Sequence, residues 1–206
     1  MKNQFDKKYW DEMYKKEKDV IIEGIDDAKY RVNYLHSFFQ IEQFQIDSIL
    51  DIGFGKAKLL KEINKIFSPS ILVALEPSKY IFDKLTNKQK NTKVFNLSYL
   101  EYTSTKIFDL GICNSVLQYI SDEEMSFFIK KMAIECRFIY ITVPTIQEYK
   151  RMQTEVNFFD LYSYSRSSTF YKKIILKYFR FVSHSILESK ILHKTSLIGS
   201  DLFTIE

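Results

Sequence analysis

Cysteine is scarce in this sequence, and the two residues present are not spaced for chemistry. Cys113 and Cys136 lie in apolar surroundings, without the close pairing that metal sites and redox motifs use. A disulfide-built scaffold and a cysteine-based metal or redox centre are therefore excluded. We expect two buried free thiols in a protein kept in a reducing compartment.

Long apolar runs are also missing, and the chain has no apolar N-terminal segment of the signal-peptide kind. The charges nearly balance, because 30 Lys and Arg stand against 26 Asp and Glu and the net charge is +4. A small positive charge spread along the chain is weak support for nucleic-acid binding. The sequence thus predicts a cytoplasmic protein that binds neither a membrane nor nucleic acid. Internal repeats, low-complexity linkers and metal-ligand clusters are absent, so no metal site is expected.

Glycine is rare as well, with five residues in the chain, yet two of them stand together after a short apolar run. Residues 48–52 have the pattern of a strand buried on both faces, and Gly53 and Gly55 allow a sharp turn after it. Apolar residues then recur at helical spacing over 58–67. Such a turn lets a ligand approach the backbone, and free N–H groups at the helix start attract a negatively charged group.

The spacing of the glycines separates the ligands that use such turns. A dinucleotide fingerprint needs a third glycine where this chain has Lys58, a bulky residue that would obstruct helix–strand packing. The phosphate-binding pattern GxxxxGK[ST] is absent. No Tyr-x-x-x-Lys pair follows the fourth expected strand. An NAD-dependent oxidoreductase is therefore disfavoured.

The 206 residues, of which 46% are hydrophobic, suffice for one domain with a sizeable core. Beyond the first strand, further strands are expected at 71–75, at 93–97, from Phe108 and at 138–143, with helices between them. This alternation predicts an α/β fold with a doubly wound parallel sheet, whose ligand crevice lies outside the carboxyl ends of the strands. A helix is expected over 168–179, and closing strands are expected at 181–187 and 202–205.

Two stretches resemble the class I S-adenosylmethionine-dependent methyltransferases. Asp51-Ile52-Gly53-Phe54-Gly55-Lys56-Ala57 is similar to their first motif, acid-x-G-x-G-x-G, with alanine for the third glycine. The stretch from Phe108 to Ile120 is similar to their fourth strand, which an aromatic–Asp pair introduces and a Val-Leu-x-aromatic turn follows. The resemblance covers roughly 49–143. It implies a seven-stranded, mostly parallel sheet with helices on both faces and an antiparallel C-terminal strand.

This resemblance implies S-adenosyl-L-methionine as cofactor and S-adenosyl-L-homocysteine as product. Glu76 ends the second expected strand, where an acid in nucleotide-binding units accepts hydrogen bonds from both ribose hydroxyls. Ser98 stands where the family usually has an adenine-binding Asp, so that Ser98 and Tyr99 would flank the adenine. The expected cofactor-binding set is Tyr9, Trp10, Tyr14, Asp51, Gly53, Phe54, Gly55, Glu76, Pro77, Ser98, Tyr99, Asn114, Ser115 and Val116.

The N-terminal helix expected over 5–18 carries an aromatic stripe. Tyr9, Trp10 and Tyr14 resemble the lid that covers the cofactor in many small-molecule methyltransferases, although a helix packed on the domain surface has the same pattern. We expect a single domain over 1–206. Residues 1–40 would form N-terminal helices and a lid, 47–143 the cofactor-binding core, and 144–206 a substrate-side segment with the closing strands.

The resemblance to small-molecule members implies methyl transfer to an oxygen or nitrogen nucleophile. The sulfonium makes the methyl group electrophilic, so the protein must align the acceptor and exclude water. A hydroxyl acceptor needs a base, and Tyr119, Glu148 and Tyr149 are the candidates, with His184 a weaker one. Asn114 is followed by Ser115-Val116 instead of the Pro-Pro-aromatic sequence of DNA and protein amide methyltransferases.

Two departures from the family pattern, Ala57 and Ser98, support an alternative hypothesis. On that hypothesis the chain is a catalytically inactive Rossmann-like cofactor-binding protein or a regulatory partner. If the chain is instead an active methyltransferase, its partner is a small-molecule methyl acceptor. We expect a monomer or a homodimer.

Overall fold

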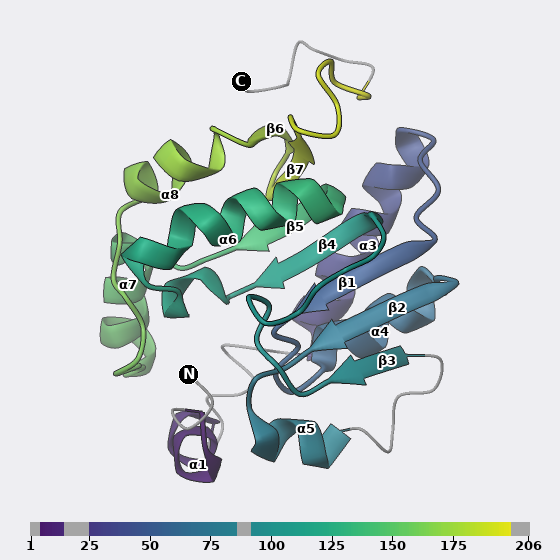
Figure 1. The fold of residues 1–206 in the computed structure, drawn as a ribbon. Helices are drawn as coiled ribbons and strands as arrows, with labels where there is room; N and C mark the ends of the chain where they lie inside the picture. Colours follow the sequence, from purple (N-terminus) through teal and green to yellow (C-terminus); the bar gives the residue numbers. More distant parts are fainter. Residues whose placement is uncertain (1–4, 15–24, 86–91, 199–206) are drawn as a thin grey trace.

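The computed structural model describes residues 5–14, 25–85 and 92–198 (Figure 1). Strands and helices alternate along most of this length, as the apolar pattern predicts. In chain order the elements are α1 (Lys7–Tyr14), α3 (Ile25–Ile41), β1 (Ser48–Ile52), α4 (Lys58–Ile66), β2 (Ile71–Leu75), α5 (Lys79–Leu85), β3 (Thr92–Phe95), β4 (Phe108–Asn114), α6 (Asp122–Glu135), β5 (Cys136–Thr142), α7 (Ile146–Val156), α8 (Ser168–Ile175), β6 (Phe179–Ser183) and β7 (Ile186–Ser189).

The strands form one seven-stranded sheet in the order β3-β2-β1-β4-β5-β7-β6. The five strands from β3 to β5 run parallel to their neighbours. Strand β7 is antiparallel to β5 and to β6. The predicted doubly wound, mostly parallel sheet with an antiparallel C-terminal strand is confirmed.

Two hydrophobic cores lie on opposite faces of the sheet, because successive strand residues point to opposite sides. Leu50 and Ile52 join the core that α6 and α8 cover. Ile49, the residue before Leu50, joins the core that α3 and α4 cover. Figure 1 shows α6 on one face of the sheet and α3 and α4 behind the other. Strands buried on both faces explain the continuous apolar runs in the sequence.

The chain leaves β1 toward β2 on one side and returns through β4 on the other, so β1 and β4 are neighbours at a topological switch point. Asp109 fixes the register there, because its Oδ2 accepts hydrogen bonds from Ser48 N at 2.9 Å and Ser48 Oγ at 2.7 Å. Figure 1 shows α1 and α7 on the side to which the arrowheads of the parallel strands point. A crevice at the carboxyl ends of β1 and β4 therefore has helices available to cover it.

The two cysteines are buried free thiols, as expected. Burial raises the pKa of both the Cys113 and the Cys136 thiol, which disfavours the reactive thiolate. Within the described ranges, no helix is long and apolar enough to cross a membrane.

The closing strands differ from the prediction. The sequence predicts one strand over 181–187, whereas the chain turns at His184 and Ser185 and forms the hairpin β6–β7. Val182 and Ile186 fit one alternating pattern across the turn, so apolar spacing does not reveal the reversal. Ser185 has a positive φ of 59°, a turn conformation without a glycine to mark it. The second expected strand, at 202–205, lies outside the described residues.

Helix α7 forms where the sequence shows only weak periodicity. Its first turn is closed by a capping box: Thr145 Oγ1 accepts from Glu148 N, and Glu148 Oε2 accepts from Thr145 N at 2.7 Å. Much of the helix surface is exposed. A helix with little buried surface needs no continuous apolar stripe, which explains the weak pattern.

A buried ion pair anchors the hairpin. Arg180 Nη1 lies 3.2 Å from Glu188 Oε2, and both side chains are almost inaccessible. Glu188 also accepts hydrogen bonds from Ser196 Oγ at 2.6 Å and Leu197 N at 2.8 Å. The pair therefore joins both strands of the hairpin to the segment that follows them.

We predict that Glu188→Ala lowers the free energy of unfolding by about 3–5 kcal/mol, because it leaves the Arg180 charge buried with only two carbonyl oxygens and no carboxylate to pair with. Urea denaturation measures this cost. As a control, Asp83→Ala removes the exposed pair between Lys79 and Asp83 and is expected to cost less than about 1 kcal/mol. Equal costs for the two variants would contradict a special role for the buried pair.

Candidate active site

A cavity of about 570 Å³ opens at the carboxyl ends of the parallel strands. Its walls come from α1, α3, the turn after β1, the ends of β2 and β4, and α7 with the segment after it. Most of the residues predicted from the sequence line it: Tyr9, Trp10, Gly53, Phe54, Gly55, Glu76, Pro77, Ser98, Tyr99, Asn114, Ser115, Val116, Tyr119, Glu148 and Tyr149. Asp51 lies outside this lining, and the side chain of Tyr14 falls outside the described part of α1.

The turn after β1 requires both of its glycines to adopt a left-handed backbone. Gly53 has φ 73° and Gly55 has φ 50°. A Cβ atom on Gly53 would lie 2.8 Å from Val116 Cγ2, so that position has no room for a side chain. At Gly55 the nearest atom to such a Cβ would be Trp10 Cη2 at 3.5 Å, an ordinary contact. The tip of the turn is thus bare backbone at the cavity wall, with the Trp10 ring beside it.

Glu76 connects the glycine turn to the start of α5. Its Oε2 accepts from Gly55 N at 2.9 Å, and its Oε1 accepts from Ser78 N at 2.8 Å. The side chain is 4% exposed, and burial raises its pKa to about 7 although both N–H bonds favour the ionised form. A carboxylate oxygen has more than one acceptor position. Glu76 can therefore hold the turn and still accept bonds from a ligand in the cavity.

Asp51 is buried on the α3 and α4 side of the sheet, and its Oδ2 has no hydrogen-bond partner within the described residues. Burial, followed by repulsion from Glu76, raises its pKa to about 8. An unsatisfied buried acceptor is costly and calls for an explanation. An ammonium group at the glycine turn, acting directly or through a water, would supply the missing donor and positive charge.

The two residues expected near an adenine have other bonds. Ser98 N and Ser98 Oγ both donate to Glu101 Oε2, at 2.8 and 3.0 Å. The Tyr99 hydroxyl donates to Glu135 Oε2 at 2.8 Å, and its ring packs edge-on against Phe128 in the α6 core. Both residues border the cavity, but the Tyr99 hydroxyl is committed to the protein interior.

Arg31 lies at the cavity wall next to the end of β4. Its Nη1 donates to Asn114 Oδ1 at 3.2 Å and to the Tyr140 hydroxyl at 3.3 Å, and its Nε donates to Asp27 Oδ2 at 2.7 Å. Thr142 Oγ1 donates to the same Asn114 oxygen at 2.7 Å. Arg31 is not among the residues predicted from the sequence, where an arginine on a helix is more commonly solvated. Its partners on other elements are visible only in three dimensions.

Helix α1 is attached to the β2 side of the cavity through Ser78. Trp10 Nε1 donates to Ser78 Oγ at 3.0 Å, and Ser78 Oγ donates to the Phe5 carbonyl oxygen at 2.6 Å. Phe5 and Tyr9 are both buried and both line the cavity. The aromatic stripe of the expected N-terminal helix therefore covers this site.

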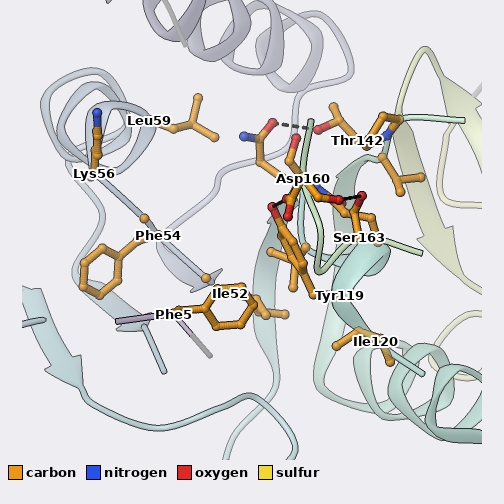
Figure 2. Close-up of a pocket in the computed structure, with 18 of the residues that line it drawn as sticks. Phe5, Ile52, Phe54, Lys56, Leu59, Tyr119, Ile120, Thr142, Asp160 and Ser163 are labelled. Carbon is orange, nitrogen blue, oxygen red and sulfur yellow. Dashed lines mark hydrogen bonds between the residues drawn. The ribbon is translucent and has the colours of Figure 1, made fainter. Parts of the chain in front are cut away.

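A second attachment joins α1 to the opposite wall through Asp160, a residue that the sequence analysis missed. Asp160 Oδ2 accepts from the Tyr119 hydroxyl at 2.6 Å and from the Tyr9 hydroxyl at 3.2 Å. Figure 2 shows the Tyr119 and Asp160 side chains meeting in the cavity, with Phe5 beside Tyr119. Tyr149 supports the same residue, since its hydroxyl accepts from Asp160 N at 2.6 Å. The only signal in the sequence is a mixture of aromatic and charged residues over 145–168.

The remaining candidate bases are less favourably situated. Glu148 closes the capping box of α7 and is exposed at the cavity rim. His184 is exposed in the β6–β7 turn and does not line the cavity, which argues against its use as a base. Among the described residues, no group of three or more His, Cys, Asp and Glu side chains could hold a metal ion.

We predict that Gly53→Ala costs about 1–2 kcal/mol of unfolding free energy from the left-handed backbone, and about 1–3 kcal/mol more from the contact with Val116. Adding Val116→Ala to that variant should recover only the second part, because the backbone strain remains. Urea denaturation of the two single variants and the double variant measures the coupling. Strictly additive costs would mean that the two residues do not touch.

The raised pKa values of Asp51 and Glu76 predict that the ligand-free protein loses stability as pH rises. The folded state binds the proton of Asp51 up to about pH 8, whereas the ordinary value is 3.8, so the folded state holds more protons between these limits. Asp51→Asn should therefore raise the melting temperature relative to wild type, by a margin that grows with pH up to about 8. The exposed Asp47→Asn serves as the control. A margin independent of pH would contradict the burial argument.

Searches against known proteins find similarity in three dimensions only. No protein-family model matches the sequence, and no curated protein matches it. Plantazolicin methyltransferase BpumL, in complex with a monoazolic desmethylPZN analogue and SAH, superposes with a TM-score of 0.65 at 16% identity. The match covers 93% of this chain and 79% of that chain.

Two other solved methyltransferases have the same arrangement. Magnesium protoporphyrin IX methyltransferase (ChlM) from Synechocystis PCC 6803 with bound SAH matches with a TM-score of 0.60 at 14% identity, covering 91% of this chain and 96% of that chain. An S-adenosylmethionine-dependent methyltransferase from Clostridium acetobutylicum ATCC 824 matches with a TM-score of 0.57 at 16% identity, covering 66% of this chain and 57% of that chain. At such identities the likeness concerns the fold. This chain has the fold of the class I S-adenosylmethionine-dependent methyltransferases.

Proposed function

We propose that this protein is an S-adenosylmethionine-dependent methyltransferase that methylates an oxygen or nitrogen atom of a small molecule. The observation that carries the proposal is the glycine turn at the switch point, held open toward a large cavity by the buried Glu76 carboxylate. Similar folds that hold SAH, the demethylated product of this cofactor, support the same function.

The cavity offers suitable partners for each part of S-adenosylmethionine. The bare backbone at Gly53 and Gly55 leaves room for the methionine portion, and Arg31 offers a positive charge for its carboxylate. Asp51 lies outside the lining, two residues before Gly53, and its unsatisfied Oδ2 would accept from the ammonium group directly or through a water. Glu76 would accept bonds from the ribose hydroxyls. Pro77, Ser98 and the backbone of Tyr99 would border the adenine, and Phe54, Asn114, Ser115 and Val116 complete the lining.

The bound cofactor would supply an electrophilic methyl group, so the protein needs to bind, orient and shield the acceptor. Residues at the end of β4 border the cavity between the glycine turn and the α7 wall, which suits a methyl acceptor on the α7 side. Helix α1, with Phe5, Tyr9 and Trp10 over the opening, would exclude water during transfer. Tyr119 and Tyr149 would orient the acceptor, and Glu148 at the rim is the remaining base proposed from the sequence.

Proposals on the location, partners and oligomeric state of the protein accompany this function. Two buried thiols without a disulfide suit a reducing, cytoplasmic location. The partner would be the small-molecule acceptor, with no nucleic acid or membrane, and the chain would act as a monomer or homodimer. A catalytically inactive cofactor-binding protein remains the second hypothesis, because Ser98 donates its hydroxyl to Glu101 and the usual adenine-binding carboxylate is missing.

Isothermal titration with S-adenosylmethionine, S-adenosylhomocysteine and NAD tests the proposal. We expect both methionine-derived ligands to bind and NAD not to bind. Trp10 is the single tryptophan of the chain and lies beside Gly55, so its fluorescence should report the same events. Glu76→Ala should weaken S-adenosylhomocysteine binding by about 1–3 kcal/mol, whereas the exposed Glu123→Ala should leave the affinity unchanged.

Binding of NAD alone, or of none of the three, would reject the proposed function. An unchanged affinity in Glu76→Ala would reject the role assigned to that carboxylate. Cofactor binding without methyl transfer to any acceptor in a cell extract would favour the inactive-protein hypothesis.

A further inference from the structure

Asp160 is a buried carboxylate at the acceptor side of the cavity, and it forms no ion pair with any described residue. The side chain is 5% exposed, and its three hydrogen bonds come from neutral donors: the hydroxyls of Tyr119 and Tyr9 on Oδ2 and the N–H of Tyr162 on Oδ1, at 3.0 Å for the last. No ion pair of the described chain involves Asp160.

Two arginines near this wall, Arg31 and Arg166, are already engaged with other carboxylates. Arg31, which also lines the cavity, pairs with Asp27 at 2.7 Å. Arg166, which follows on the same segment, pairs with Asp122 at 2.6 Å and donates to two carbonyl oxygens. A buried carboxylate that lacks a counter-charge carries a desolvation cost that a cationic ligand would offset.

Aromatic rings surround this carboxylate. Phe5 packs edge-on against Tyr9 and Tyr119, each with ring centroids 5.1 Å apart, and Tyr149 packs edge-on against Phe158. All five of these residues line the cavity together with Asp160. Aromatic faces attract cations through the ring quadrupole, and a desolvated site strengthens that attraction. Rings and a carboxylate together form a site suited to a small organic cation.

Gln118 adds an acceptor that has no hydrogen-bond partner among the described residues. Its side chain is 6% exposed and lines the cavity, and its Oε1 accepts no hydrogen bond from any described residue. A ligand that donates several N–H bonds would satisfy both Gln118 and Asp160. A hydroxyl group has one donor and no charge, so it would leave the carboxylate uncompensated.

We propose that the methyl acceptor is an amine that binds in its protonated form, with its ammonium group on the Asp160 carboxylate and among the rings of Phe5, Tyr9 and Tyr119. This inference rests on the proposed function and narrows it from oxygen or nitrogen to nitrogen. It assigns Asp160 as the residue that selects the acceptor.

The same carboxylate provides a route for the proton that blocks the reaction. An ammonium nitrogen has no lone pair until one N–H bond breaks, and Asp160 is the base that its proton would reach. The neutral amine then forms the new C–N bond as the C–S bond breaks and sulfur keeps the electron pair. The product nitrogen is cationic again, and the proton on Asp160 passes to solvent when the product leaves.

Matched pairs of amines and alcohols test the proposal on the protein saturated with S-adenosylhomocysteine. The probes are 2-phenylethylamine with 2-phenylethanol and benzylamine with benzyl alcohol, titrated calorimetrically at neutral pH. We expect each amine to bind at least about tenfold more tightly than its alcohol. Asp160→Asn keeps the size of the side chain and should abolish this preference, with the affinity for S-adenosylhomocysteine changed by less than about twofold.

Glu155→Gln, which removes an exposed carboxylate at the cavity rim, is the matched control and should keep the preference. Equal binding of amine and alcohol by the wild type, no amine binding at all, or a preference that survives Asp160→Asn would overturn the proposal. The wild-type comparison decides the matter even if Asp160→Asn does not fold. A wild type that fails to bind S-adenosylhomocysteine would instead reject the proposed function, so the two failures are distinguishable.

Discussion

The cavity edge of this sheet, at the carboxyl ends of the parallel strands, depends on one buried carboxylate. Glu76 ends β2, and its two oxygens accept from Gly55 in the turn after β1 and from Ser78 at the start of α5. Two loops that are far apart along the chain are thereby held at a fixed separation. Ser78 then accepts from Trp10 and donates to Phe5, so the docking of α1 depends on the same position. Removing the Glu76 carboxylate would therefore release the glycine turn and also weaken the packing of α1 against Ser78.

The central sheet was predictable because its strands are buried on both faces. Residues such as Ile49 and Leu50 pack into different cores, so every position favours an apolar side chain and the run is visible in the sequence. The glycine turn was predictable for a related reason, since few other residues tolerate its backbone. Ala57 is instructive here: it adopts φ 59° and ψ 24°, so the third position of the motif demands a left-handed backbone rather than merely a small side chain. An alanine there carries a strain of about 1–2 kcal/mol.

The α7 side of the cavity was much less predictable, because long-range contacts define it. The Asp160 carboxylate contacts two residues that are distant in the sequence. Tyr119 is 41 positions away from it along the chain, and Tyr9 is 151 positions away. Nothing in the local pattern distinguishes Asp160 from a solvated acid on a loop. Two other features were missed for different reasons. Helix α7 buries little surface, so its sequence shows no clear apolar stripe. The β6–β7 turn interrupts a run of alternating apolar residues without changing their spacing. Glu148 and Tyr99 use polar atoms in hydrogen bonds within the protein, and the local sequence does not reveal those bonds.

Helix α1 joins the two halves of the cavity through adjacent residues. Trp10 donates to Ser78 on the β2 side, and Tyr9 donates to Asp160 on the α7 side. The two bonds arise within one helical turn, so the helix cannot leave one wall and remain on the other. On the function proposed above, exchange of either ligand past this helix would therefore open the whole chamber. Cofactor and acceptor would then share a single gate, and the slower-leaving molecule would be exposed to solvent whenever the faster one departs.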